Sequence, residues 1–489
     1  MSKRVARFWN KGGVGIAIAA LALAVGGVVL LEAPGHAVPS PGGGGGPFAG
    51  ADDARPIAPA SGTRASLSGP SLDGHFALAE GAVLAAGTRR VLAELRFNAS
   101  TDARPSDARQ PVALALVMDI SGSMSGDKIV QARTAVQQMI ERMHGDDHVA
   151  VILYDHEVQV LQPLARVGAV RRELVSRLSY VDARGGTVIP PALEAGAQAL
   201  EQAPPHLVRR VVLLSDGQDG SGVPLPVLAE NLRGRAGRGI AASALGIGAD
   251  YDERFMTTVA DAGRGNYAFM AGGAPLAAFL RRELDEAAQT VVDGLAATVT
   301  LPSGWRLRHA HGAEADGRAG TITLAFGPLA AGDTRRAVLD LEVDAGAPGE
   351  LGALAASARY RTVADRRDHR VESDRIAVRA VATEAEIAAS RDESIYGETW
   401  ATVVDAAQAE AVEAWRRGDV TTARQISQGN AQQLRAVAAA APAAAPRMTS
   451  QIAELETDQR NFDLLAPTSE AGRAYGLGSN AARHARARR

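Results

Sequence analysis

The chain has 489 residues, of which 46% are hydrophobic, 22% are charged and 4% are aromatic. This length exceeds one compact domain and suggests roughly three, and the apolar content excludes a disordered chain. The formal net charge of −3 provides no overall basic field for nucleic acid, and the absence of cysteine excludes disulfides, thiolate zinc sites, iron–sulfur clusters and a thiol nucleophile.

Residues 1–38 predict a signal anchor. An uncharged run at residues 12–31 follows several basic residues, and a helix of this length spans about 30 Å, which is the thickness of a bilayer core. The basic residues place this end in the cytoplasm and the bulk of the chain outside it, in the periplasm or at the cell surface. The alternative is a cleavable signal peptide, because Gly35 and Ala37 are small enough for a cleavage site, and the chain would then be secreted.

Residues 39–62 are rich in Gly, Pro, Ala and Ser, which is typical of a flexible linker. Residues 63–110 contain alternating segments that predict strands.

Residues 111–290 differ, because continuous apolar runs are separated by segments with helical spacing. The main runs are 112–120, 149–154, 208–214 and 240–247. This pattern predicts a doubly wound α/β domain whose mainly parallel sheet is covered on both faces. A hairpin partner is expected at 158–161 and an edge strand at 266–270, and the ligand site should follow the carboxyl ends of the strands.

The C-terminal part of the sequence changes pattern again. Residues 291–382 alternate without helical spacing and predict a flanking antiparallel β-sandwich. The strands of 63–110 are expected to join it, so that the α/β domain is an insertion. Residues 383–466 predict a helical hairpin or bundle in which Asp419 caps a second helix. Residues 467–489 predict a disordered basic tail, either solvated or bound to an anionic partner.

Five oxygen-bearing side chains lie in loops of the predicted α/β domain. Asp119, Ser121 and Ser123 occupy alternate positions of one tight loop, between a buried strand and a helix. Thr187 and Asp216 add two oxygen donors at corresponding loop positions. Hard oxygen donors without His or Cys suit Mg²⁺, Mn²⁺ or Ca²⁺ better than zinc. The alternative for the two serines is simple capping of the following helix.

This arrangement resembles the metal-ion-dependent adhesion site of the von Willebrand factor A (VWA) domain, over about residues 111–290. The family pattern is D-x-S-x-S, then a distant Thr, then a distant Asp. The resemblance implies a metal ion, Mg²⁺ by preference with Mn²⁺ or Ca²⁺ as alternatives, and a partner protein whose Asp or Glu carboxylate completes the coordination. The implied metal ligands are Asp119, Ser121, Ser123, Thr187 and Asp216. The expected rim that contacts the partner consists of Met124, Gly186 and Asp219.

The expected function is therefore Mg²⁺-dependent protein–protein interaction, in adhesion or scaffolding, by a bacterial membrane-anchored protein of the cell envelope. No enzymatic activity and no binding of nucleotide or nucleic acid is expected. An alternative is a regulatory or assembly subunit beside an AAA+ ATPase, as in chelatases, although export opposes it because ATP is cytoplasmic. A metal-assisted hydrolase is a further alternative, but the motif contains no poised nucleophile and no His or Glu as a general base.

Overall fold

The computed structural model describes residues 62–101, 109–270, 273–318 and 320–489. The predicted anchor at 1–38 lies outside these residues, as does the predicted linker at 39–62 apart from Gly62. Within the described ranges, no helix combines the length and the apolar character needed to cross a membrane.

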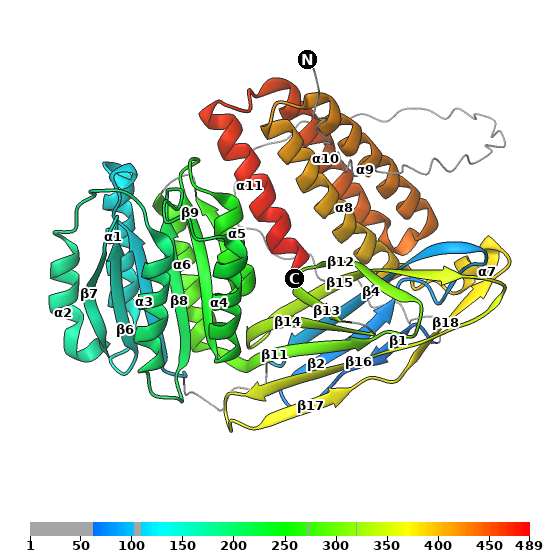
Figure 1. Cartoon of the computed structure of the whole chain (residues 1–489), viewed down its shortest axis with the longest axis horizontal. Coiled ribbons are helices and arrows are strands. Elements are labelled where there is room, and N and C mark those ends of the chain that lie inside the picture. Colours follow the sequence, from blue (N-terminus) through cyan, green and yellow to red (C-terminus); the bar gives the residue numbers. More distant parts are fainter. Residues whose placement is uncertain (1–61, 102–108, 271–272, 319) are drawn as a thin grey trace, which may run out of the picture. The chain divides into compact units, whose positions relative to one another are not determined.

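A six-stranded sheet forms the centre of the α/β domain (Figure 1). Its order is β10-β9-β8-β5-β6-β7, and all neighbours are parallel except β6 and β7. The strands are β5 (Val112–Asp119), β6 (His148–Tyr154), β7 (Val158–Arg166), β8 (Val208–Ser215), β9 (Ile240–Ile247) and β10 (Arg264–Met270). β5 is buried along its whole length, which explains its nearly continuous apolar sequence.

Helices cover both faces of this sheet. On one face are α1 (Asp127–Arg142), α2 (Val167–Leu178) and α6 (Gly273–Ala288). On the other face are α3 (Ile189–Glu201), α4 (Leu225–Gly237) and α5 (Glu253–Ala262). The side chains of β5 alternate between the two cores, with Leu116 and Met118 on the first side and Ala115 and Val117 on the second. The predicted doubly wound α/β fold is confirmed, together with the β6–β7 hairpin and the edge strand β10.

Two further sheets enclose a separate hydrophobic core and form the predicted sandwich. The first has the order β1-β2-β4-β15-β12, and the second β13-β14-β11-β16-β18-β3, with β17 paired to β16. Phe97 of the first sheet meets Phe326 of the second edge to face, with ring centroids 5.2 Å apart. Strands of the first sheet are β1 (Arg64–Ser66), β2 (Leu72–Leu78), β4 (Gly87–Ala99), β12 (Trp305–His311) and β15 (Thr334–Ala345). Those of the second are β3 (Ala82–Leu84), β11 (Thr290–Thr300), β13 (Glu314–Arg318), β14 (Thr321–Ala330), β16 (Gly349–Thr362), β17 (Asp368–Glu372) and β18 (Ile376–Val381).

The sandwich is built from both sides of the α/β domain in the sequence. β4 precedes that domain and pairs with β15, which follows it, over Gly87–Asn98 and Thr334–Ala345. β3 likewise pairs with β18. The α/β domain is therefore an insertion into the sandwich, as predicted.

The C-terminal helices pack on the sandwich and on one another. They are α7 (Glu384–Ala389), α8 (Glu393–Arg416), α9 (Val420–Ala440) and α10 (Ala445–Leu464). Ile395 of α8 packs against Leu92 of β4. The predicted cap is present, because the Asp419 side chain accepts a hydrogen bond from the backbone N–H of Thr422. The helical prediction for this region is confirmed.

The prediction of a disordered tail at 467–489 is wrong. Residues Glu470–Ala487 form helix α11, and its Leu477 is fully buried in the core on one face of the α/β sheet. Arg483 pairs with Asp458 and Arg486 with Asp405, both on the other C-terminal helices. Burial of Leu477 and these ion pairs order the segment. Its arginines contact acids of the same chain, whereas the prediction gave them to solvent or to an anionic partner.

Candidate functional site

Asp119 organises the loop that follows β5. Its side chain is fully buried, and Oδ1 accepts a hydrogen bond from the backbone N–H of Ser121 at 2.8 Å. Oδ2 accepts one from the Ser215 hydroxyl at 2.7 Å, and the Tyr154 hydroxyl lies 3.4 Å away. Burial raises the pKa of Asp119, although the hydrogen bonds from Ser121 and Ser215 oppose the shift. This carboxyl group therefore ties together the ends of three neighbouring strands, β5, β6 and β8.

A row of oxygen atoms leads from this loop to the end of β8. Ser121 Oγ lies 3.0 Å from Ser123 Oγ, and the Ser123 hydroxyl donates to Asp216 Oδ1 at 2.8 Å. Ser121 and Asp216 are buried, whereas Ser123 is exposed. On its far side, Asp216 Oδ2 receives an ion pair from Lys128 Nζ at 2.5 Å. This row of oxygens therefore begins and ends at buried side chains, Ser121 and Asp216, and is open to solvent at Ser123.

Thr187 reaches the same place from the loop before α3. A methyl group placed on Gly217 would lie 3.2 Å from Thr187 Oγ1 and 3.7 Å from Ser123 Oγ. Backbone hydrogen bonds hold the three loops together, from the N–H of Gly122 to the carbonyl of Gly185 at 3.0 Å and from the N–H of Gly220 to the carbonyl of Thr187 at 2.9 Å. The structure thus brings all five predicted ligand residues to one edge of the sheet.

The predicted rim is only partly present. Met124 is fully buried in the core beneath the loop, so its interpretation as a residue that contacts a partner is wrong. Gly186 is exposed beside the row of oxygens. Asp219 lies nearby, but its carboxylate accepts hydrogen bonds from the backbone N–H of Ile189, at 2.9 Å, and from the Ser221 hydroxyl. Asp219 therefore holds the first residue of α3.

The capping alternative for the two serines does not fit the structure. The N-cap residue of α1 is Gly126, and no side chain caps that helix. Ser121 precedes a short 3-10 turn (Gly122–Met124) and also makes no side-chain capping bond there. The serine hydroxyls point instead into the row of oxygens.

Two residues of this edge were not identified as functional from the sequence. Ser215 immediately precedes Asp216 and fixes Asp119, and Lys128 supplies the positive charge beside Asp216. The sequence did contain a signal for Lys128, because a residue in the first turn of the helix that follows a loop stays close to that loop.

Among the described residues, no group of three or more His, Asp or Glu side chains is placed to hold a metal ion. The candidate site instead combines two carboxylates with three hydroxyls.

Comparison with known proteins agrees with the fold of the α/β domain. The family model of the von Willebrand factor type A domain matches residues 113–275. The protein sll0103 of Synechocystis sp. is 27% identical over 194 residues, and YfbK of Escherichia coli is 24% identical over 196 residues. The alignments cover 38% and 39% of this chain but only 44% and 34% of these relatives, so less than half of each relative is matched.

A solved structure extends the likeness to the rest of the fold. The von Willebrand factor type A protein from Catenulispora acidiphila aligns with a TM-score of 0.59 and 18% identity, covering 86% of this chain and 97% of that one. At this identity the match shows a shared fold. The chain therefore contains a VWA domain within a larger architecture that at least one other protein shares.

Proposed function

We propose that this chain binds a partner protein through a divalent metal ion, Mg²⁺ by preference, held at the carboxyl edge of its VWA sheet. The supporting observation is the row of oxygens from Ser121 through Ser123 to Asp216, with Thr187 beside it. Domains of this family are protein-interaction modules, which agrees with a role in adhesion or scaffolding.

The chemistry of the predicted ligands suits Mg²⁺. They offer hydroxyl and carboxylate oxygens, which are the donors that hard divalent cations prefer. The separations of 3.0 Å between the two serine hydroxyls and 2.8 Å between Ser123 and Asp216 are those of hydrogen bonds and are short enough for these atoms to bind one ion together. Mn²⁺ and Ca²⁺ are the alternatives.

Each residue has a distinct role in this proposal. The hydroxyls of Ser121, Ser123 and Thr187 and the carboxylate of Asp216 would hold the ion. Asp119, whose oxygens accept hydrogen bonds from Ser121 and Ser215, would fix the loop and contact the ion directly or through water. A bound ion would supply an electrophilic centre for a carboxylate. Solvent reaches the site beside Ser123, which is where an Asp or Glu of the partner would enter.

We propose a binding role without catalysis. The sequence from Asp119 to Lys128 contains no His or Glu that could act as a general base. We also propose that the uncharged run at residues 12–31 anchors the chain in the membrane and leaves its bulk in the cell envelope. Cell fractionation with carbonate extraction would test the anchor, since release into the soluble fraction contradicts it.

Titration calorimetry of the full-length chain with MgCl₂ tests the metal site. We expect saturable binding with a Kd of about 1 mM or tighter, weakened at least tenfold by Ser123→Ala. Ser125→Ala is a matched control, because Ser125 lies on the same loop and donates to the Gly122 carbonyl, away from the row of oxygens. Equal binding by Ser123→Ala and the wild type would contradict the proposed site.

A glutamate-rich peptide tests the partner chemistry. We expect the peptide to bind in MgCl₂ and to be released by EDTA, and Ser123→Ala to bind it poorly under both conditions. The corresponding glutamine-rich peptide is the control for the carboxylate. Metal-independent binding of the acidic peptide would contradict the proposed mechanism even if Mg²⁺ itself binds.

A further inference from the structure

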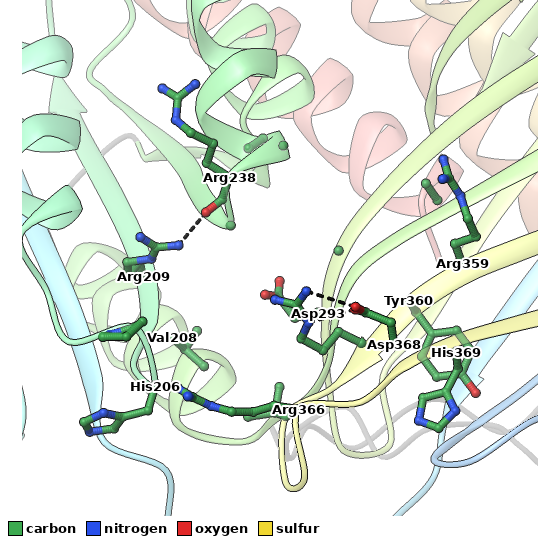
Figure 2. Close-up of a pocket in the computed structure, with 18 of the residues that line it drawn as sticks. His206, Val208, Arg209, Arg238, Asp293, Arg359, Tyr360, Arg366, Asp368 and His369 are labelled. Carbon is green, nitrogen blue, oxygen red and sulfur yellow. Dashed lines mark hydrogen bonds and ion pairs between the residues drawn. The ribbon is translucent and has the colours of Figure 1, made fainter.

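A second site candidate lies at the opposite end of the VWA sheet. A cleft of about 860 Å³ is lined on one side by the segment leading into β8 and by the end of α4, and on the other by β11, β16 and β17 (Figure 2). β8 runs from this cleft at Val208 to the metal edge at Ser215, a distance of roughly 25 Å for an eight-residue strand. The cleft is therefore separate from the proposed metal site, and its volume is typical of small-molecule pockets between domains.

Guanidinium groups dominate the lining of this cleft. Its arginines are Arg209, Arg238, Arg359, Arg361, Arg366 and Arg370, against the carboxylates of Asp293 and Asp368. Arg361 pairs with Asp368 at 2.8 Å. Arg359 and Arg366 make no ion pair or side-chain hydrogen bond with any described residue. Arg238 and Arg370 pair with Glu201 and Glu372 outside the lining, so the unpaired positive charge among the described residues is that of Arg359 and Arg366.

Asp293 is one of the two carboxylates in this lining. Burial raises its pKa, while the charges of Arg361, Arg209 and Arg264 oppose the shift. Asp293 Oδ2 and a guanidinium nitrogen of Arg209 both lie close to Gly239, at 3.5 and 3.2 Å from where a methyl group on that glycine would be. The charges of these arginines favour the ionised carboxylate, but no ion pair joins Asp293 to any of them in the described part of the chain.

Arg366 is held in a conformation that an arginine rarely adopts. It lies in the turn between β16 and β17 with a φ of 58°, in the left-handed region that favours glycine. Its side chain extends from the sandwich across the cleft toward Val208 and His206 of the VWA domain (Figure 2). A strained residue that directs an unpaired charge into a cleft is a candidate for ligand contact.

We propose that this cleft binds a phosphate ester through Arg366 of the sandwich and Arg209 of the VWA domain. Guanidinium groups are strong hydrogen-bond donors to phosphate, and donors arriving from two domains suit a tetrahedral oxyanion better than a planar carboxylate. The cleft is much larger than a phosphate group, so the organic part of the ester would fill the remaining volume. Because the ligand would contact both domains, its binding would also strengthen their attachment.

Calorimetry in EDTA tests this site while the metal site is kept empty. The probes are pyrophosphate and glycerol 3-phosphate, with glycerol as the uncharged control. We expect saturable binding of both anions to the full-length chain, and we expect Arg366→Gly to weaken it about tenfold, the usual effect of losing one charged hydrogen bond. Glycine suits the left-handed turn, so this variant should unfold at or above the wild-type temperature.

Arg367→Ala is the matched control, because Arg367 lies in the same turn but outside the cleft lining and pairs with Asp365. It should bind the probes as the wild type does. The proposal is overturned if neither anion binds at up to about 10 mM, if Arg366→Gly binds like the wild type, or if Arg367→Ala loses as much affinity. Binding of hexaglutamate without binding of either phosphate probe would also overturn it and assign the cleft to an acidic polypeptide.

Discussion

Lys128→Met tests the charge balance at the metal edge. Lys128 Nζ lies 2.5 Å from Asp216 Oδ2, and the aspartate side chain is fully buried while the lysine side chain is 32% exposed. At an effective dielectric constant of about 20, opposite charges about 4 Å apart attract by about 4 kcal/mol. Screening at the partly exposed lysine reduces this to about 2 kcal/mol. Because methionine leaves Asp216 without a counter-charge, we expect the VWA domain to lose about 2 kcal/mol of unfolding free energy, or roughly 4–8 °C in Tm.

Differential scanning calorimetry is the suitable assay, because no tryptophan lies between residues 111 and 290 to report on this domain by fluorescence. The variant is measured in EDTA and in MgCl₂. If the proposed metal site is correct, the ion replaces the missing positive charge, and at 100 times its Kd it stabilises the domain by about 2.7 kcal/mol. The variant should gain more from Mg²⁺ than the wild type, since the ion no longer competes with an ammonium group for Asp216.

The double variant Lys128→Met, Asp216→Asn separates charge from packing. Removing both charges should recover most of the stability lost in EDTA, and the Mg²⁺ response should disappear. If Lys128→Met in EDTA unfolds at the same temperature as the wild type in EDTA, the assigned charge balance is refuted. A double variant no more stable than the single one would show that the loss came from other contacts of Lys128, such as its approach to Gly248.

Three further changes test other parts of the structure. Gly217→Ala places a methyl group 3.2 Å from Thr187 Oγ1, so calorimetric titration should show weaker Mg²⁺ binding with little change in Tm, and unchanged binding would contradict the tight approach. Burial opposes ionisation of Glu94, but the His75 hydrogen bond and neighbouring arginines lower its pKa from 4.5 to about 2. A lowered carboxyl pKa stabilises the fold above pH 4.5 and the effect is lost toward pH 2, so Glu94→Gln should cost about 3 kcal/mol at pH 7. The urea unfolding curves of the variant and the wild type, followed by tryptophan fluorescence, should converge near pH 2, and a constant gap would refute this linkage. Leu477→Ala should cost about 2–5 kcal/mol through the cavity it leaves, and a wild-type calorimetric profile would contradict the docking of α11.

Much of the α/β fold was predictable because its signals are local and strong. A fully buried strand such as β5 must be apolar along its length, and each covering helix must carry one apolar stripe. The sandwich was predictable in class but not in detail. β12, β13 and β17 carry little periodic signal because they are short or contain many charged and polar residues, as in Asp368–Glu372. Their pairing depends on neighbours distant in the sequence, which periodicity does not reveal.

The candidate site shows the same division between local and distant information. Asp119, Ser121 and Ser123 share one loop, and parallel strands bring their following loops to one edge, so the convergence with Thr187 and Asp216 could be anticipated. The side chain of Met124 could not be placed this way. In the loop it stands between exposed residues, yet it turns inward to fill the core under α1. Spacing along a loop predicts which residues are near a site but not which way each one faces.

Arginine illustrates why a sequence pattern alone does not separate structural charge from binding charge. The arginines of α11 looked like a free basic tail, but Arg483 and Arg486 are paired with aspartates of α10 and α8. Arg359 and Arg366 lie in strand and turn sequences that gave no functional signal, and among the described residues neither has a partner. The pairing observed in the structure therefore overturns the expectation for the tail and draws attention to two arginines for which the sequence gave none. Because Arg483 and Arg486 already have counter-charges within the chain, an external anion would have to compete with aspartates there, whereas it meets no such competitor at Arg366 among the described residues.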